Sequence, residues 1–345
     1  MGPALALAAA VLFGLSAPAA KMLLGAMDPW LLAGLLYLAS GVGLGAMFTV
    51  RAATGGVRET PLHRADAPWL GGAIVTGGLI GPVLMMFGLM HTGAARGALL
   101  LNLEGVFTAL LAWFVFREHF DARIALGMAA IGAGALLLAW EPSAGFAIDV
   151  GALLVAGASL AWAIDNNLTR RVSGGDPVQI AALKGAGAGT INVLLAIAGG
   201  AMWPRAATVA GAAVVGLVGY GTSLVLFVQA LRRLGTSRTS AYFSTAPFIG
   251  AVAGVLVLGE PLTARLAAAG ALMALGLWLH LTERHEHEHV HEALEHAHLH
   301  WHDEHHRHEH EPGDPPGEPH AHAHVHSLLR HRHPHYPDLH HRHGH

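Results

Sequence analysis

The sequence predicts an all-α integral membrane protein in which ten transmembrane helices form two inverted five-helix repeats. Three observations support this fold class. First, 53% of the 345 residues are hydrophobic and only 12% are charged, about half the charged share of a soluble domain. Second, apolar runs of spanning length recur along the first 283 residues. Third, the stretch that begins at Gly93 recurs from Gly235 onward.

The apolar runs are separated by charged residues, Gly or Pro, which mark loops between helices. Each run is close to the length that crosses a hydrocarbon core of about 30 Å. The first run has no positively charged residue ahead of it, as a signal peptide would have, so we expect it to be retained as a helix. In order, the runs cover residues 3–25, 29–50, 68–90, 97–116, 122–140, 150–168, 178–202, 207–231, 239–258 and 262–282.

The duplication extends across both halves of the chain, over residues 1–141 and 149–283. The matched pairs are Asp28-Pro29 with Asp176-Pro177, Phe13 with Trp162, Ser16 with Asp165, Lys21 with Arg170, Gly93 with Gly235, Arg96 with Arg238, Ala109 with Ala251, Glu118 with Glu260 and Arg123 with Arg265. Because five helices are an odd number, the second copy must lie inverted in the membrane. Inverted repeats are typical of secondary transporters, whose substrate site lies near the midplane between the halves.

Positively charged residues in short loops predict the orientation. With a cytoplasmic N-terminus, the cytoplasmic loops hold ten of them, and the opposite face holds only Lys21, Arg96, Arg205 and Arg265. We therefore expect a multi-pass protein of the cell (inner) membrane with both termini in the cytoplasm. Small residues such as Gly105, Gly250 and Gly254 predict close helix packing in lipid.

Short motifs in both repeats resemble the EamA family of the drug/metabolite transporter superfamily. Phe13-Gly14-Leu15-Ser16 stands where that family has a Trp-Gly-Ser-like start, and the spans that close in Phe116-Arg117-Glu118 and Leu258-Gly259-Glu260-Pro261-Leu262 resemble its L-G-E-x-L-T repeat endings. The resemblance covers about residues 3–283. It implies a carrier of amino acids, metabolites or drugs with a cavity between helices 1, 3, 4, 6, 8 and 9.

Three ionisable residues lie deep in the predicted spans, where each costs about 2.5–3.5 kcal/mol and should face protein or a wet cavity. Asp165 shares one helical stripe with Trp162 and Asn166, and Lys184 lies on the next helix. Two roles fit Asp165 and Lys184: an interhelical ion pair that fixes the fold, or a cavity site for a charged or zwitterionic substrate.

Glu104, the third deep ionisable residue, has no obvious countercharge in the sequence. It is a candidate for proton coupling, and a protonated, hydrogen-bonded structural role fits equally. Further candidate cavity residues are polar positions on helices 4, 7 and 9. They are Asn102, Asn192, Tyr242 and Ser244.

The C-terminal segment, residues 284–345, is a different kind of sequence. Histidine occupies 23 of the 61 positions from His285 to His345, mixed with acidic residues, a composition that predicts a disordered cytoplasmic tail. Neutral imidazoles at H-x-H spacing favour zinc or nickel binding, although a pH-dependent polyelectrolyte or neutral drift also fits. The candidate ligands are His285, His287, His289, His291, His320, His322, His324 and His326.

These observations favour a secondary transporter, in the export direction, of a small amino-acid-like or drug-like metabolite. A divalent-metal (Zn/Ni/Co) exporter that collects ions on the tail is one alternative, and a non-transporting metal or pH sensor is another. No nucleophile–base or metal–water constellation indicates an enzyme. No cofactor is required, and the tail is expected to bind Zn or Ni. The expected partners are a small-molecule substrate, the lipid bilayer and divalent metal ions but no nucleic acid, and a homodimer is left open.

Overall fold

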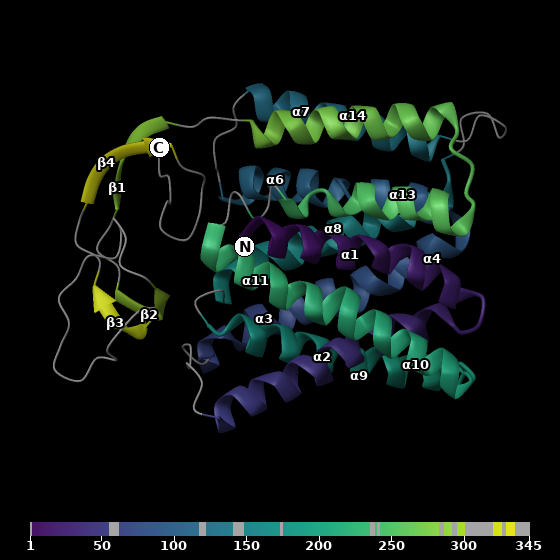
Figure 1. Cartoon of the computed structure of the whole chain (residues 1–345), viewed down its shortest axis with the longest axis horizontal. Helices are drawn as coiled ribbons and strands as arrows, with labels where there is room; N and C mark the ends of the chain where they lie inside the picture. Colours follow the sequence, from purple (N-terminus) through teal and green to yellow (C-terminus); the bar gives the residue numbers. More distant parts are fainter. Residues whose placement is uncertain are drawn as a thin grey trace.

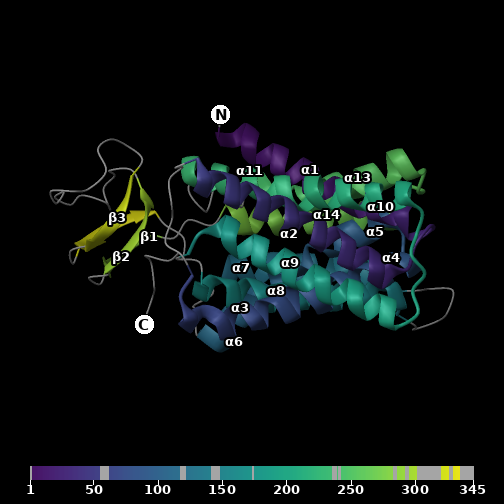
Figure 2. The ribbon, with the colours of Figure 1, turned by 90° about the horizontal axis from the view of Figure 1, so that it is seen from below.

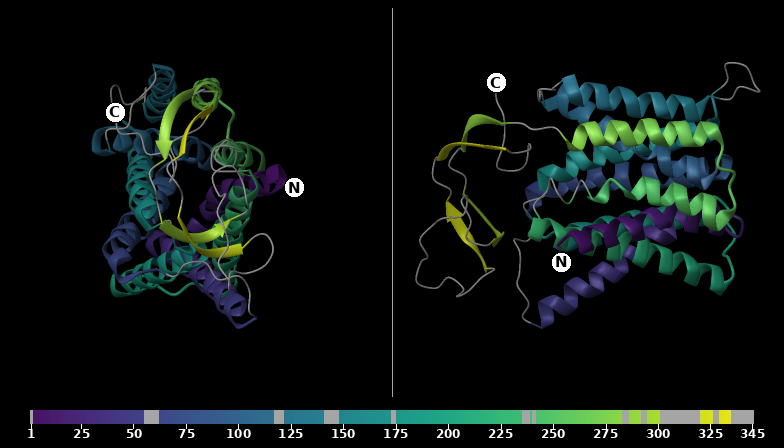
Figure 3. Two further views of the ribbon diagram at one scale, coloured as in Figure 1. Left: turned by 90° about the vertical axis from the view of Figure 1, so that its left-hand side faces the viewer. Right: turned by 45° about the horizontal axis from the view of Figure 1, so that its top comes forward.

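The computed structural model describes residues 2–54, 62–116, 122–140, 148–172, 175–234, 239 and 242–282, together with four strands between residues 286 and 334. Helices pack side by side in one elongated bundle, and the strands lie beyond one end of it (Figure 1). The beginning of α1 and the end of α14 lie at that same end of the bundle (Figure 1). An end-on view shows the helices grouped around the long axis behind the strands (Figure 3).

The first half of the chain builds α1 to α7. Their bounds are α1 Gly2–Leu24, α2 Pro29–Ala53, η1 Arg64–Asp66, α3 Ala67–Ala73, η2 Ile74–Ile80, α4 Gly81–His91, α5 Ala94–Leu100, α6 Leu103–Phe116 and α7 Ala122–Ala139. The second half follows the same order. It consists of α8 Val150–Val172, α9 Pro177–Ala198, α10 Ala206–Val215, η4 Gly216–Thr222, α11 Ser223–Leu234, α13 Ala246–Leu258 and α14 Ala264–Leu281.

The described part of the chain contains seven helices that are long and apolar enough to cross a membrane. Two shorter apolar helices, Ala246–Leu258 and Ala264–Leu279, accompany them. Helix α8 is 23 residues long, but its Asp165-Asn166-Asn167 segment lowers its hydropathy. The multi-pass membrane architecture expected from the sequence is therefore confirmed.

Matched caps start the second helix of each half. The Asp28 side chain accepts hydrogen bonds from the Trp30 and Leu31 amides, with a proline at the first helical position. Asp176 accepts from the Val178 and Gln179 amides in the same way. Both arrangements satisfy amide groups that a helix N-terminus leaves unpaired. The matched Asp-Pro pairs of the sequence are thus equivalent structural features.

The two halves meet most extensively where α2 packs against α9 (Figure 2). Glycines make this approach possible, because a Cβ atom added to Gly185 would lie 2.7 Å from the Cα atom of Gly41. The last helices of the halves, α7 and α14, form a second tightly packed pair. Close backbone contact of this kind is how helices associate in lipid.

Small residues on the fourth and ninth predicted spans behave differently from one another. Gly250 and Gly254 pack closely, since added Cβ atoms would lie 2.7 Å from the Gly14 carbonyl oxygen and 2.6 Å from the Ala95 amide nitrogen. At Gly105 an added Cβ would meet nothing within 4 Å. The packing role expected of Gly105 is therefore wrong, and open space lies beside it.

The described part of the tail consists of four short strands. Their bounds are β1 Glu286–His291, β2 Glu295–His300, β3 His320–Val325 and β4 Leu329–Pro334. Strand β1 pairs antiparallel with β4, and β2 pairs antiparallel with β3. The backbone register places histidine opposite histidine, for example His298 opposite His322. Disorder of the tail as a whole stays a prediction.

Candidate functional site

The two halves share two irregularities in the middle of their helices. Residues Ile74–Ile80 form a π-helical segment, and so do Gly216–Thr222, 142 positions later. The predicted fourth span is broken into α5 and α6 by turn residues at 101–102, and turn residues at 244–245 precede α13 in the second half. Paired interruptions at corresponding positions of two repeats indicate the substrate site of a transporter, and π-segments are frequent at functional sites.

A chelated ion pair joins α8 to α9 in this region. The Lys184 ammonium donates to both carboxylate oxygens of Asp165, at 2.6 and 2.8 Å, and to the Thr169 hydroxyl at 3.0 Å. Thr169 in turn donates to Asp165 at 2.9 Å. All three ammonium hydrogens are thereby used. The ion pair expected from the sequence is present, and it satisfies both charges at membrane depth.

Glu104 lies in the first turn of α6, directly after the break. Its carboxylate accepts a 2.8 Å hydrogen bond from the side-chain amide of Asn166 on α8. Neither Lys21 nor Arg96 reaches it. Lys21 donates to the carbonyls of Leu89 and Thr92 at the end of α4, and Arg96 pairs with Asp149.

The π-segment η2 exposes carbonyl oxygens that side chains of three other helices bind. The Gly77 carbonyl accepts from the Tyr37 hydroxyl and from the Trp162 indole, both at 2.9 Å. The Gly78 carbonyl accepts from the Asn192 amide, also at 2.9 Å, and Asn192 accepts from the Trp30 indole at 2.9 Å. A π-segment widens the helical hydrogen-bond pattern, which leaves these carbonyls for side-chain donors.

A series of aromatic rings connects the two halves of the chain. The Tyr37 ring lies 5.7 Å from the Tyr220 ring, and Tyr220 lies 5.7 Å from Phe13. Phe13 lies 5.4 Å from Phe243, which lies 4.8 Å from Phe227. These separations are within the range of favourable ring contacts. The Trp162 indole nitrogen lies 3.3 Å from the Tyr37 hydroxyl. The ring series therefore continues to α8, which carries part of the charged cluster formed by Glu104, Asp165 and Lys184.

The model of the EamA-like transporter family matches residues 1–140 and again residues 149–282. This chain belongs to that family. An "Uncharacterized transporter" of Methanothermobacter thermautotrophicus is 26% identical over 294 residues, which are 79% of this chain and 83% of the relative. An uncharacterized protein of Pseudomonas aeruginosa is 29% identical over 229 residues, which are 66% of this chain and 78% of the relative.

A solved crystal structure has the same fold as this EamA-like transporter. It covers 81% of this chain and 95% of its own chain, with a TM-score of 0.58 and 19% sequence identity. That likeness concerns the fold alone. The family model and the apolar helices identify a membrane transporter of small molecules.

Five of the residues predicted from the sequence come together at the charged cluster. They are Trp162, Asp165, Asn166, Lys184 and Glu104. Asn192 joins through η2. The others lie elsewhere. Asn102 donates to the Leu99 carbonyl at 2.8 Å and faces Met273 of α14, and Tyr242 and Ser244 lie in the segment before α13.

Sequence reasoning missed the aromatic series and the π-segment carbonyls. Tyr37 and Tyr220 are two of only four tyrosines in the chain, and tyrosine within an apolar span is the signal that could have found them. The carbonyls of Gly77 and Gly78 carry no such signal, because every residue has a carbonyl. Thr169, one turn after Asp165 on α8, completes the ion pair.

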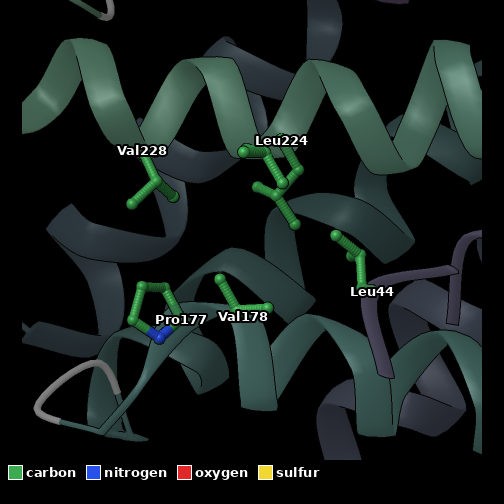
Figure 4. A pocket seen from close by; sticks show the side chains of 6 residues that line it. Leu44, Pro177, Val178, Leu224 and Val228 are labelled. Atoms are coloured by element: carbon green, nitrogen blue, oxygen red, sulfur yellow. The ribbon is translucent and has the colours of Figure 1, made fainter. Parts of the chain in front are cut away.

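Two other regions were candidates for ligand binding. A small depression between α2, α9 and α11 is lined only by apolar side chains, among them Leu44, Val178 and Leu224 (Figure 4). It offers no polar group to orient a ligand.

Among the residues that the structure describes, no group of three or more His, Asp or Glu is placed to hold a metal ion. Of the predicted tail ligands, His285 and His326 lie outside the described residues.

Proposed function

We propose that this EamA-like transporter is a secondary-active carrier that exports a small amino-acid-like or drug-like metabolite across the cell membrane. The observation that carries the proposal is the repetition of both helix irregularities, the π-segment and the broken span, at corresponding positions of the two halves. Such irregular backbone within a membrane is tolerated where it lines a cavity or is buried in protein.

The chemistry around these irregularities supports a substrate with two different ends. The charged cluster combines Glu104 of the first half with Asp165 and Lys184 of the second. The aromatic series likewise combines Phe13 of the first half with Tyr220 of the second. Matched positions of the duplication differ in charge, with the neutral Ser16 where the second half has Asp165. Polar groups fix the orientation of a ligand, and aromatic surface binds its apolar part.

The proposed topology has ten crossings and inverted repeats, with both termini in the cytoplasm. Spans 3 and 8 each contain a π-segment, spans 4 and 9 each contain a break, and the shorter helices α13 and α14 complete the second repeat. The common location of the start of α1 and the end of α14 fits an even number of crossings (Figure 1).

The decisive experiment is transport by purified full-length protein in sealed vesicles. An imposed pH gradient should drive accumulation of one or more members of a panel of amines, amino acids, carboxylates and divalent metals. If Glu104 couples transport to protons, Glu104→Gln should fold and bind substrate but lose gradient-driven accumulation. The Asp28→Asn variant is a matched carboxyl-to-amide control, because asparagine caps a helix as well as aspartate. Absence of transport of every compound would reject the proposal.

A second proposal concerns the tail, which we expect to bind zinc or nickel. The register of β2 and β3 places three histidine pairs at alternate positions of one two-stranded ribbon. Alternate positions share a face of a strand, and imidazole suits both metals. Titration of vesicle-reconstituted protein with Zn²⁺, with and without residues 285–345, tests this. A metal exporter would lose metal efflux on truncation, whereas a metabolite carrier would keep its transport.

A further inference from the structure

The charges of the deep cluster do not balance. Lys184 and Asp165 neutralise one another through two hydrogen bonds of 2.6 and 2.8 Å. Among the residues that the structure describes, the hydrogen-bond donor to Glu104 is a neutral amide, that of Asn166. Among the described residues deep in the helices, the cluster therefore carries one negative charge without a matching cation. The first turn of α6 favours a negative charge at Glu104 through the helix dipole.

We propose that Glu104, Thr108 and Asn166 form a subsite for the ammonium group of an amphipathic amine, with its apolar part directed to the aromatic series. This inference rests on the proposed transport function and names the substrate class of the same site. The other two deep charges are already satisfied, so Glu104 is the group that a charged ligand would complete.

Open space adjoins Glu104 beside Gly105 of α6. A Cβ added to Gly105 would meet nothing within 4 Å, whereas Phe114, nine residues further on, is 72% exposed. Nine residues are two and a half turns of an α-helix, so Gly105 and Phe114 lie on opposite faces. Gly105 is itself exposed, and the buried residues Leu103 and Val106 lie between these two faces of α6, so the open space at Gly105 borders the packed side of the helix.

The same periodicity places Asn166 on the inner side of α8. Leu153 and Leu160 are 54% and 40% exposed, and their spacing of seven residues puts them on one outer face. Asn166 is also exposed, but it lies about 120° around the helix from Leu160. It shares its side of α8 with Trp162, four residues earlier, which is buried and begins the ring series. Asn166 thus lies between the open space and the aromatic rings.

An unsatisfied polar group completes the argument for a ligand. The hydroxyl oxygen of Thr108 is buried and has no hydrogen-bond partner in the described structure. Thr108 lies one turn after Glu104, on the same face of α6. A buried polar group without a partner calls for a ligand or water. The Glu104 carboxylate, the Thr108 hydroxyl and the Asn166 amide oxygen are three acceptors, and an ammonium group has three N–H donors.

Binding of matched probes to the detergent-solubilised full chain at pH 7 tests the subsite without any gradient. Phenethylamine has a cation and a ring, hydrocinnamate has an anion on the same ring, and ethylamine has the cation alone. We expect phenethylamine to bind at least about tenfold more tightly than either other probe, measured by calorimetry. Glu104→Gln should weaken phenethylamine binding at least about tenfold, which is about 1.4 kcal/mol.

Matched variants separate the subsite from a general effect on the fold. Gly105→Val should fill the open space and weaken phenethylamine binding, whereas Gly132→Val, at another glycine with nothing within 4 Å, should not. Asp28→Asn should leave the affinity unchanged. Equal affinity for hydrocinnamate, or unchanged affinity in Glu104→Gln, would overturn the subsite.

The outcome for transport is distinguishable from the outcome for binding. If phenethylamine binds as expected but no compound is carried across vesicles, the subsite stands and the transport proposal fails. If vesicles accumulate another metabolite while no amine binds, transport stands and the amine subsite is wrong.

Discussion

The Asp165–Lys184 pair gives the sharpest test of the charged cluster. Replacing Asp165 by Asn removes the carboxylate that accepts two ammonium hydrogen bonds, at 2.6 and 2.8 Å. Lys184 then keeps its hydrogen bond to the Thr169 hydroxyl. The side chains are only 10% and 17% exposed for Asp165 and Lys184, so water compensates little. Loss of one partner from a buried pair costs about 3–5 kcal/mol.

The reverse substitution, Lys184→Met, removes all three donated hydrogen bonds at once. It leaves the Asp165 carboxylate with the 2.9 Å bond from Thr169. Since hydrogen bonds to a charged group contribute about 1.5–3 kcal/mol each, a cost in the same range of about 3–5 kcal/mol follows. The double variant leaves no unpaired charge, so it should be more stable than the less stable single variant.

Thermal unfolding of the purified proteins in one detergent measures these differences. Each single variant should lower the unfolding midpoint by on the order of 10 °C, and the double variant should recover part of that loss. The coupling free energy from the cycle should be at least about 1 kcal/mol, as expected for residues in direct contact. A double variant no better than the worse single variant would refute the pairing as a stabilising interaction.

Three further predictions follow from particular contacts. Gly81→Ala should destabilise the protein by about 1–3 kcal/mol, because the added Cβ atom would lie 2.7 Å from the Trp162 indole nitrogen. The control variant Gly71→Ala, whose added Cβ would meet nothing within 4 Å, should be neutral or stabilising. Thermal unfolding measures both. Glu260→Ala should cost about 0.5–2 kcal/mol, since the Glu260 carboxylate accepts from the Ala94 and Ala95 amides at 2.6 and 2.9 Å; an unchanged midpoint would reject this cap. Truncation after Arg284 should leave the unfolding midpoint unchanged and abolish zinc binding at pH 7. In the full chain the zinc should be released below the imidazole pKa of about 6.5, because protonated imidazoles cannot bind metal, and retention at pH 5 would contradict histidine ligation.

Contacts at the helix ends explain the glutamate and the arginine of the repeat-ending motifs. The Glu of the second repeat ending, Glu260, satisfies the first amides of α5 in the opposite half. The following arginine, Arg265, donates to the Leu137 and Leu138 carbonyls near the end of α7, at 2.5 and 3.2 Å. In the first half the matched Arg123 donates to Thr282 at the end of α14. Each motif therefore stabilises a helix of the other repeat.

The amino-acid sequence alone determined the membrane class, the duplication and the composition of the charged cluster. Apolar runs of spanning length fix the class, because unpaired backbone groups cannot face lipid and helices satisfy them internally. The cost of a charge in lipid singles out Glu104, Asp165 and Lys184 among the residues of the spans. Asp165 and Lys184 each lie about two helical turns from the short loop between their helices, which made their pairing foreseeable, and the structure confirms it.

Only the tertiary structure decided how the helices deviate from regularity and which distant groups meet. Hydropathy reports the average environment of a segment, so it cannot detect the change in hydrogen-bond pattern at Ile74–Ile80 or the break before Glu104. The Glu104–Asn166 hydrogen bond joins residues 62 positions apart, and the Tyr37–Gly77 bond joins two different helices. Such contacts depend on how packed helices are rotated and shifted relative to one another. Small residues at facing positions of two helices set that arrangement, so the sequence of a single helix does not encode it.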